Sequence, residues 1–395
     1  MKSNKIEISQ KNFGEIFFKL GVVFLLSIPI LSGLFFILAI SFSIKTYKEY
    51  YFGSLWNKYF FSAGIFLLLS AVILSFKNYN NGIQLSANWI GLINWIPYLI
   101  CFWAFKPYLA HFQKRRKILI ITLIGSIPLL VTGIGQYFFN WHGPIKLLNG
   151  LITWFQRPIN YQYGGLTGLF NNENYASLWL LIIWPIGIAC IKDKQLSKTN
   201  RFFFLFITVL TTLCTLLTRA RMARIQLFIS YIFSFIRDNF FLFIPLIIII
   251  FLCILFIPQF INTLDKPYGI FSRLDNYNIY ELIEGMALLT RIEIWGIAIS
   301  AILSKPFFGW GPTTFPMLFD SHNNGYEMTH THNIFLEVSY NYGLLSSIFL
   351  TIPVISILFL AFKVIFIKDQ KRNSQKSNFE KAWWISCFTI IISHL

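Results

Sequence analysis

The residues best suited to chemistry in this chain are histidines and arginines that interrupt long apolar runs. His332 lies in the segment Thr329-His-Thr-His-Asn333, directly before an apolar run. A histidine titrates near neutral pH, so it can take a proton from a hydroxyl group during a reaction. We therefore interpret His332 as a candidate general base; the alternative is an interfacial side chain without a chemical role. His330 is interpreted as its neighbour, and Asn333 as a helix cap.

Arginines form the second candidate group. Arg219, Arg221 and Arg224 occupy a very short turn between two apolar runs, and Arg291 lies in a later polar stretch. A guanidinium group stays charged and donates paired hydrogen bonds to phosphate oxygens. Arg219, Arg221 and Arg291 are thus candidates for binding an anionic group such as a diphosphate. The alternative is that these side chains reach lipid phosphates at the membrane surface.

A third polar patch runs from Gly164 to Asn174. Its glycines do not predict a phosphate-binding loop, because no strand precedes them and no Gly-Lys-Ser/Thr follows. We expect the patch to form a polar wall or to cap the next helix, with Asn174 in a supporting role. Because Asp-x-Asp, His-Glu-x-x-His and Cys-x-x-Cys are all missing from the sequence, we expect no metal site, and we expect no other cofactor.

The composition says what kind of protein must position these residues. The 395 residues are 56% hydrophobic and only 12% charged, and their mean hydropathy is +0.61. These values exclude a soluble globular domain and predict a single all-α integral membrane domain over residues 1–395. The excess of Lys and Arg behind the net charge of +17 is expected to lie in the loops that set membrane orientation. It does not indicate nucleic-acid binding, because the basic residues are scattered between the apolar runs.

The apolar runs predict a polytopic helical bundle with about eleven spans. The first run, residues 17–44, is interpreted as a hairpin broken near Ser27-Ile28-Pro29 and Ser32-Gly33, and the alternative is one long span. The other spans are expected at residues 59–76, 90–105, 118–138, 177–191, 202–218, 223–236, 240–260, 333–362 and from 382 onward.

The charge pattern predicts which loops face which side. The basic segments 114–117, 192–201 and 363–381 are expected on the cytoplasmic face. The long loops 139–176 and 261–332 then lie on the outer face, where loops of such length are usually functional. Within the second loop we expect a surface amphipathic helix over Leu288–Ile302 and a rigid turn from Pro306 to Pro312. The chain ends inside an apolar segment at Leu395, which favours a truncated natural protein.

Several short motifs resemble the O-antigen ligase and polymerase superfamily of bacterial envelope glycan assembly. Gly168-Leu-Phe-Asn-Asn-Glu-Asn174 resembles its Gly-x-Phe-x-Asn-x-x-Asn segment. Ala220-Arg-Met-Ala223 is similar to its Ser-Arg-Gly-Ala turn, with alanine and methionine in place of serine and glycine. Arg291-Ile-Glu-Ile-Trp295 and Pro306-Phe-Phe-Gly-Trp-Gly311 resemble its Arg-x-x-x-Trp and Pro-x-x-Gly-x-Gly block. His332, Asn333 and Gly343 match its His-Asn-x9-Gly-x-x-Gly signature, whose last glycine is Ser346 here.

The resemblance implies a framework of about twelve spans in the bacterial plasma membrane, with an active site facing the periplasm. It implies an inverting, metal-independent glycosyltransferase that works on a lipid-linked oligosaccharide donor carrying undecaprenyl diphosphate. Arg221 and Arg291 would hold the diphosphate, and His332 would activate an acceptor hydroxyl of a glycan or of lipid A core. We add Arg219 as a further diphosphate contact, which the resemblance does not imply. Two alternatives stay open: a polymerase of the same superfamily, or a transporter of a small anion such as bicarbonate.

Overall fold

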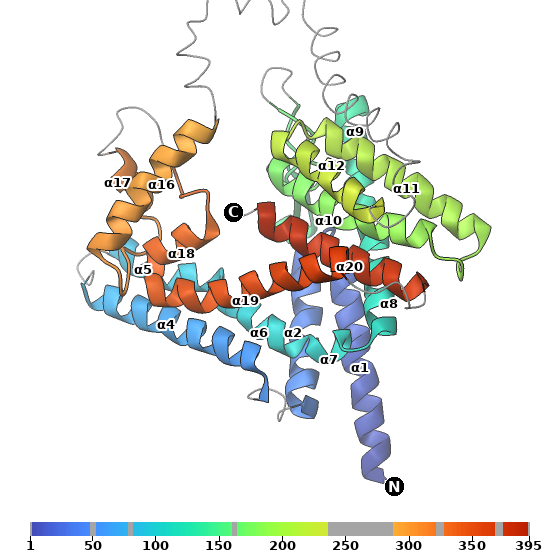
Figure 1. Cartoon of the computed structure of the whole chain (residues 1–395), viewed down its shortest axis with the longest axis horizontal. Coiled ribbons are helices and arrows are strands. Elements are labelled where there is room, and N and C mark those ends of the chain that lie inside the picture. Colours follow the sequence, from blue (N-terminus) through green and yellow to red (C-terminus); the bar gives the residue numbers. More distant parts are fainter. Residues whose placement is uncertain are drawn as a thin grey trace, which may run out of the picture. The chain divides into compact units, whose positions relative to one another are not determined.

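The computed structural model describes residues 2–47, 53–77, 82–159, 164–235, 287–320, 328–367 and 374–393. The described chain is mostly helical, in agreement with the predicted helical bundle. It divides into two compact units (Figure 1). The first unit comprises residues 1–46, 105–269 and 357–393. The second comprises residues 47–104, 270–356 and 394–395.

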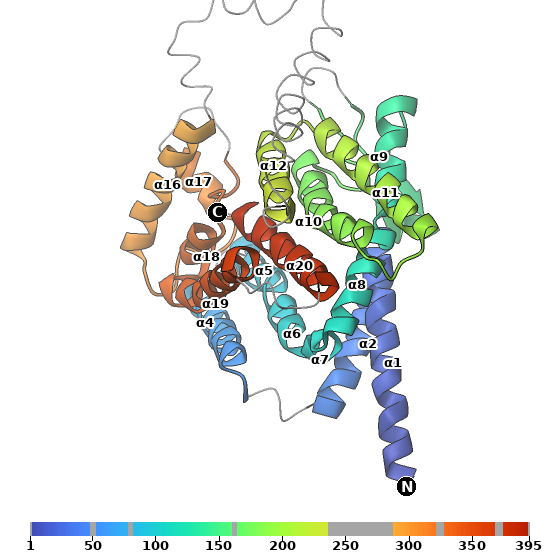
Figure 2. The same ribbon diagram turned by 45° about the vertical axis from the view of Figure 1, so that its right-hand side comes forward.

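The predicted hairpin at the N-terminal end is confirmed. Helix α1 ends at Phe24 and helix α2 begins at Pro29, so the chain reverses where the sequence places proline. The two helices pack through stacked rings such as Phe17 on Phe35, and the Ser32 hydroxyl donates to the Gly21 carbonyl over 2.7 Å. Figures 1 and 2 both show α1 running beside α2 and α8.

The first unit is built around α10, which packs against α11, α12 and α20 (Figure 2). Its core consists of buried aliphatic side chains, among them Leu123, Leu180 and Ile183. The helices and strands of this unit are α1 Lys2–Phe24, α2 Pro29–Tyr47, α7 Lys106–Leu109, α8 Phe112–Gly125, α9 Ile127–Phe139, β1 Ile145–Leu147, β2 Ile152–Trp154, α10 Glu173–Ile191, α11 Lys198–Leu217, α12 Arg221–Phe235 and α20 Ser374–Ser393.

The described part of the predicted loop 139–176 is a folded segment. Strands β1 and β2 form a short antiparallel hairpin that the sequence did not predict. The buried amide of Gln136 on α9 holds the next stretch: its oxygen accepts from the amides of Thr167 and Gly168 at 2.9 and 2.8 Å, and its nitrogen donates to the Arg157 carbonyl at 2.6 Å. A fully bonded buried amide fixes a loop firmly, because leaving any of these groups unpaired is costly.

The second unit contains α4 Leu55–Lys77, α5 Gly82–Ile93, α6 Ile96–Ala104, α16 Ala287–Ser304, α17 Phe315–Asp320, α18 Ile334–Tyr342 and the first part of α19 Leu344–Phe362. The prediction of one span over 333–362 is wrong. Gly343 separates α18 from α19, and its φ of 89° is a conformation that continues no helix. The predicted helix over 288–302 is confirmed as α16. Its face away from the core exposes Ile292, Ile299 and Leu303, so that face is not purely polar.

Six helices or helix pairs among the described residues are long and apolar enough to cross a membrane. They are Leu55–Phe76, Leu85–Ala104, Phe112–Phe139, Glu173–Ile191, Lys198–Leu217 and Leu344–Phe366. The apolar helices Pro29–Lys45 and Met222–Phe235 are shorter. The predicted span at 240–260 lies outside the described residues. The expected total of about eleven spans is therefore not confirmed.

Candidate active site

The histidine loop, residues 328–333, is tied to the start of α18. Asn333 caps this helix, as predicted, because its side-chain oxygen accepts from the amides of Phe335 and Leu336 at 3.0 and 3.2 Å. Thr331 is fully buried, and its amide donates to a carboxylate oxygen of Glu337 over 3.0 Å. These contacts fix the backbone on both sides of His332.

His332 itself has a left-handed backbone and a side chain that is exposed only in part. Its φ is 54°, which is uncommon for a residue other than glycine and persists only where neighbouring contacts impose it. The ring of His330 lies beside it, with 4.2 Å between the ring centroids. The Nδ1 of His330 is bonded to the Thr329 hydroxyl at 2.7 Å. The loop therefore presents the ring of His332 outward from a well-anchored backbone.

Helix α16 connects Arg291 to the histidine loop. Arg291 and Trp295 are four residues apart and so lie on one face of the helix. The indole nitrogen of Trp295 donates to the carbonyl of Thr331 over 3.1 Å. Arg291 forms no hydrogen bond or ion pair with another residue in the part of the chain that the structure describes. Its half-buried guanidinium group is thus available to an anion on the side of α16 that carries the histidine loop.

The surroundings of His332 lower its pKa below the ordinary histidine value. Partial burial is the largest cause, and the positive charges of His330 and Arg291 act in the same direction; the carboxylate of Glu337 acts against them. A lowered pKa keeps the imidazole neutral near pH 7. The neutral ring is the form that can accept a proton.

The Pro306–Pro312 turn packs backbone to backbone against the end of α18. Three hydrogen bonds join them: the Trp310 amide to the Tyr340 carbonyl at 2.7 Å, the Gly311 amide to the Asn341 carbonyl at 3.1 Å, and the Leu344 amide to the Pro306 carbonyl at 2.8 Å. The Ser70 hydroxyl on α4 donates to the carbonyl of Phe308 over 2.6 Å. The turn thereby links the ends of α16 and α18 to α4.

Two glycines make this close packing feasible. A Cβ atom on Gly309 would overlap the carbonyl of Tyr340, and one on Gly343 would overlap the carbonyl of Phe307. Both residues also have a positive φ. The two motif glycines are thus explained by one contact between two backbones.

The arginine turn belongs to the first unit and lies beside the glycine patch. Arg219 has a left-handed φ of 60°, and its carbonyl accepts from the guanidinium of Arg224 at 3.3 Å. The Leu166 amide donates to the Leu217 carbonyl over 2.9 Å, and a Cβ on Gly165 would overlap the carbonyl of Thr218. Arg221 is the first residue of α12, and the position of its side chain lies outside the description.

The glycine patch ends by capping α10, which confirms one of the two expectations for it. The cap is Asn172, whose side-chain oxygen accepts from the amide of Asn174 at 2.7 Å. Asn174 lies in the first turn of α10, and its side chain is exposed. A role for Asn174 in supporting a site stays a prediction.

The structure therefore assembles two groups of motif residues, each inside its own unit. The first unit joins the glycine patch to the arginine turn, and the second joins Arg291, Trp295, the Pro306–Pro312 turn and the histidine loop. Sequence reasoning missed Glu337. The available signal was an acidic residue in the first turn of a helix that follows a candidate base. The described residues contain no group of three or more His, Cys, Asp or Glu side chains that could hold a metal ion.

Comparison with known proteins finds a similarity that covers most of these motifs. No curated protein matches the chain. The model of the family described as O-antigen ligase matches residues 204–351, which include the arginine turn, Arg291, the Pro306–Pro312 turn and the histidine loop. Together with the apolar helices, this match supports a multi-pass bacterial membrane protein and a glycosyl-transfer type of enzyme. Residues 204–351 are thus similar to the O-antigen ligase superfamily.

Proposed function

We propose that the protein is an O-antigen ligase-like glycosyltransferase of the bacterial plasma membrane with its active site on the periplasmic face. The donor is a glycan linked to undecaprenyl diphosphate, and the acceptor is a hydroxyl group of lipid A core or of another glycan. One observation carries the proposal. The anchored loop presents a histidine with a lowered pKa, and Arg291 is close enough for its charge to contribute to that shift.

The proposed reaction is a single displacement. The neutral ring of His332 takes the proton of the acceptor hydroxyl while its oxygen attacks the anomeric carbon of the donor sugar. The new glycosidic bond forms as the bond from that carbon to the diphosphate oxygen breaks on the opposite face, so the anomeric configuration inverts. The undecaprenyl diphosphate leaves with the bonding electron pair. The imidazolium of His332 then returns its proton to solvent.

Arginines stabilise the leaving group in this proposal. Arg221 and Arg291 bind the diphosphate, with Arg219 as a further contact, and their fixed positive charge offsets the negative charge that develops on the leaving oxygen. Losing one such donor commonly lowers the rate by a factor of about one hundred. His330, Asn333 and Asn174 have supporting roles.

The test is glycan transfer by purified full-length protein in lipid nanodiscs, with a lipid diphosphate-linked glycan as donor. We expect His332→Ala to lower transfer at least about a hundredfold and Arg291→Ala to lower it by a similar factor. His111→Ala changes an exposed histidine at the start of α8 and serves as the matched control, with transfer unchanged. Near-normal transfer by both His332→Ala and Arg291→Ala would refute the mechanism.

The same assay separates ligase from polymerase activity. A ligase moves one preassembled glycan to the acceptor, which gives a product of a single added size. A polymerase lengthens the lipid-linked glycan itself, which gives a ladder of products without any lipid A core acceptor. We expect transfer that depends on the added acceptor.

A further inference from the structure

Asn341, near the end of α18, connects two parts of the candidate active site. Its backbone carbonyl accepts from the amide of Gly311 in the Pro306–Pro312 turn over 3.1 Å. Its side-chain amide donates to a carboxylate oxygen of Glu337 over 2.7 Å. Glu337 and Asn341 are four residues apart in one helix, so their side chains lie on the same face. Asn341 therefore joins the turn to the carboxylate that also bonds the histidine loop.

The carboxylate of Glu337 has one described donor for each of its oxygens. One oxygen accepts from the side chain of Asn341, and the other accepts from the backbone amide of Thr331 over 3.0 Å. Bonds to both oxygens fix the position and the plane of the carboxylate. Because Thr331 directly precedes His332 in the chain, the negative charge is fixed near the candidate base. Glu337 is only partly buried, so its carboxylate can turn toward water if one of these bonds is lost.

The side chain of Asn341 has no other hydrogen bond in the part of the chain that the structure describes. The residue is 7% exposed, and its side-chain oxygen has no partner among the described residues. A buried amide with one end unpaired adds little to stability, because the unpaired oxygen has lost its contact with water. A contribution to stability therefore does not explain an asparagine at this position, whereas a dedicated bond to Glu337 does.

Three ionisable side chains among the described residues act on the pKa of His332, and they are His330, Arg291 and Glu337. After burial, which is the largest cause, the two positive groups lower that pKa, and the carboxylate alone raises it. Glu293 on α16 is exposed and lies two residues from Arg291, on a different face of the helix. Burial raises the pKa of Tyr340 and of Tyr342, so both phenols stay neutral below pH 8. The position of the one carboxylate thus matters for the base.

We propose that Asn341 is a positioning residue, which holds the carboxylate of Glu337 beside the histidine loop so that His332 is fixed for proton transfer. This inference rests on the proposed function, in which His332 is the base. Without the amide of Asn341, the carboxylate turns toward water, where a charge is better solvated. The greater distance and the intervening water then weaken its attraction for the imidazolium form of His332.

Asn341→Leu tests the proposal in the nanodisc transfer assay, because leucine has a similar size and lacks the amide. We expect kcat to fall about tenfold with KM changed less than about twofold. The acidic limb of the pH dependence should move to lower pH, because a weaker attraction for the imidazolium lowers the pKa of His332. Asn88→Leu is the matched control. Asn88 is another fully buried asparagine of the second unit, and its side chain has no partner among the described residues. It should leave the limb unchanged.

Titration of His332 by nuclear magnetic resonance separates this inference from the proposed function, because it requires no transfer. Histidine labelled with carbon-13 at Cε1 reports each imidazole, and the signal lost in His332→Ala assigns the base. We expect a lower pKa of His332 in Asn341→Leu. The same substitution should have no such effect in a protein that already carries Glu337→Gln, because the charge that it displaces is then missing.

Two outcomes would overturn the inference. One is an unchanged pKa of His332 in Asn341→Leu, and the other is an equal change in the protein with Glu337→Gln. A lowered pKa in a protein that transfers no glycan would refute the proposed function and still support the placement of Glu337 by Asn341. Asn341→Ala replaces Asn341→Leu if that variant does not fold, and the same results are expected of it.

Discussion

At the scale of single residues, the protein shows how one histidine can be prepared to accept a proton. His332 receives opposing influences: burial and two positive neighbours lower its pKa, and Glu337 raises it. Glu337 also accepts from the amide of Thr331 and from the side chain of Asn341. Glu337 therefore positions the loop, and its charge also limits how far the pKa of His332 is lowered.

The pH dependence of transfer should report these influences. Because only the neutral ring accepts a proton, kcat/KM should fall as the pH drops through the lowered pKa of His332. Arg291→Gln removes a positive charge, so the pKa should rise and the acidic limb should move to higher pH. Glu337→Gln removes a negative charge, so the limb should move to lower pH. Transfer rates measured between pH 4 and 8 in nanodiscs check this, and a limb that moves in neither variant would point to a different base.

At the scale of elements, the site of the second unit depends on contacts between backbones. The end of α18 and the Pro306–Pro312 turn approach each other through glycines, and three main-chain hydrogen bonds join them. Such contacts tolerate no added side chain. They explain why the break between α18 and α19 falls at a glycine in the middle of an apolar run.

Gly343→Ala should therefore destabilise the protein. Its φ of 89° strains any other residue, and its Cβ would overlap the Phe307 carbonyl; we expect a loss of about 1–3 kcal/mol. Gly296→Ala is the matched control, because Gly296 lies in α16 and, among the described residues, no atom outside its own stretch of helix comes within 4 Å of an added Cβ. It should be neutral or stabilising by up to about 1 kcal/mol. Thermal unfolding of both variants in detergent measures the difference, and equal unfolding temperatures would contradict the packing argument.

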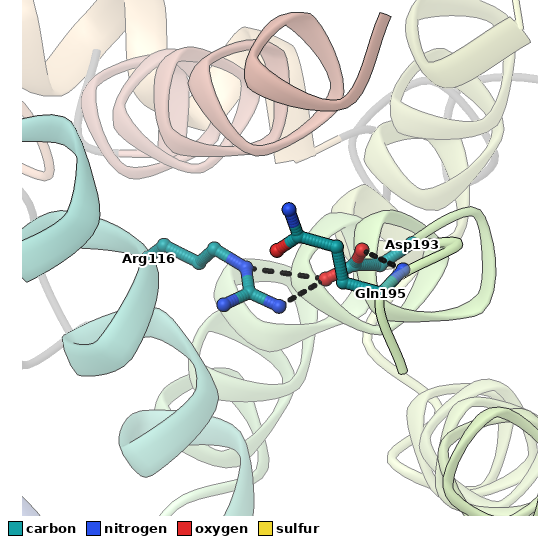
Figure 3. Close-up of polar contacts among 3 residues, drawn as sticks. All are labelled: Arg116, Asp193 and Gln195. Atoms are coloured by element: carbon teal, nitrogen blue, oxygen red, sulfur yellow. Dashed lines mark hydrogen bonds and ion pairs between the residues drawn. The ribbon is translucent and has the colours of Figure 1, made fainter. Parts of the chain in front are cut away.

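At the scale of the whole molecule, the first unit separates its two kinds of polar residue. The basic segments 114–117 and 192–201 meet through the pair of Arg116 and Asp193 (Figure 3), at the end of α10 that follows Ile191. The glycine patch and the arginine turn meet at the other end, where α10 begins and α11 ends. The predicted orientation requires this arrangement, with the basic segments at one end of the helices and the candidate site motifs at the other. The side of the membrane that each end faces is a prediction.

Accessibility to a membrane-impermeant maleimide would test that orientation. In a variant whose five native cysteines are replaced by alanine, Leu148→Cys should react in intact spheroplasts. Lys194→Cys should react only after the membrane is opened. Both positions are exposed, so the difference in labelling would come from sidedness. Labelling of Lys194→Cys in intact spheroplasts would reverse the predicted orientation.

The sequence by itself determined the class of protein and several local features. Apolar content established a membrane-spanning helical chain, proline placed the break between α1 and α2, and the Asn333 side chain predicted the cap of α18. These features depend on the solvent that each residue prefers and on local backbone geometry, and both can be read from neighbouring residues. The order of the short motifs also predicted the similarity to the O-antigen ligase family that residues 204–351 show.

Only the tertiary structure decided which of these motifs lie together. The bond from Trp295 to Thr331 and the contact of the Pro306–Pro312 turn with Gly343 join residues distant in sequence. So do the bond from Leu166 to Leu217 and the convergence of Lys192 and Lys381 on Ser234. Hydrophobic periodicity carries no information about such pairings. The hydrophobic effect is non-directional, so an apolar side chain is stabilised by burial against any apolar neighbour. Main-chain hydrogen bonds and close glycine contacts select the partner, and they form only when the helices pack.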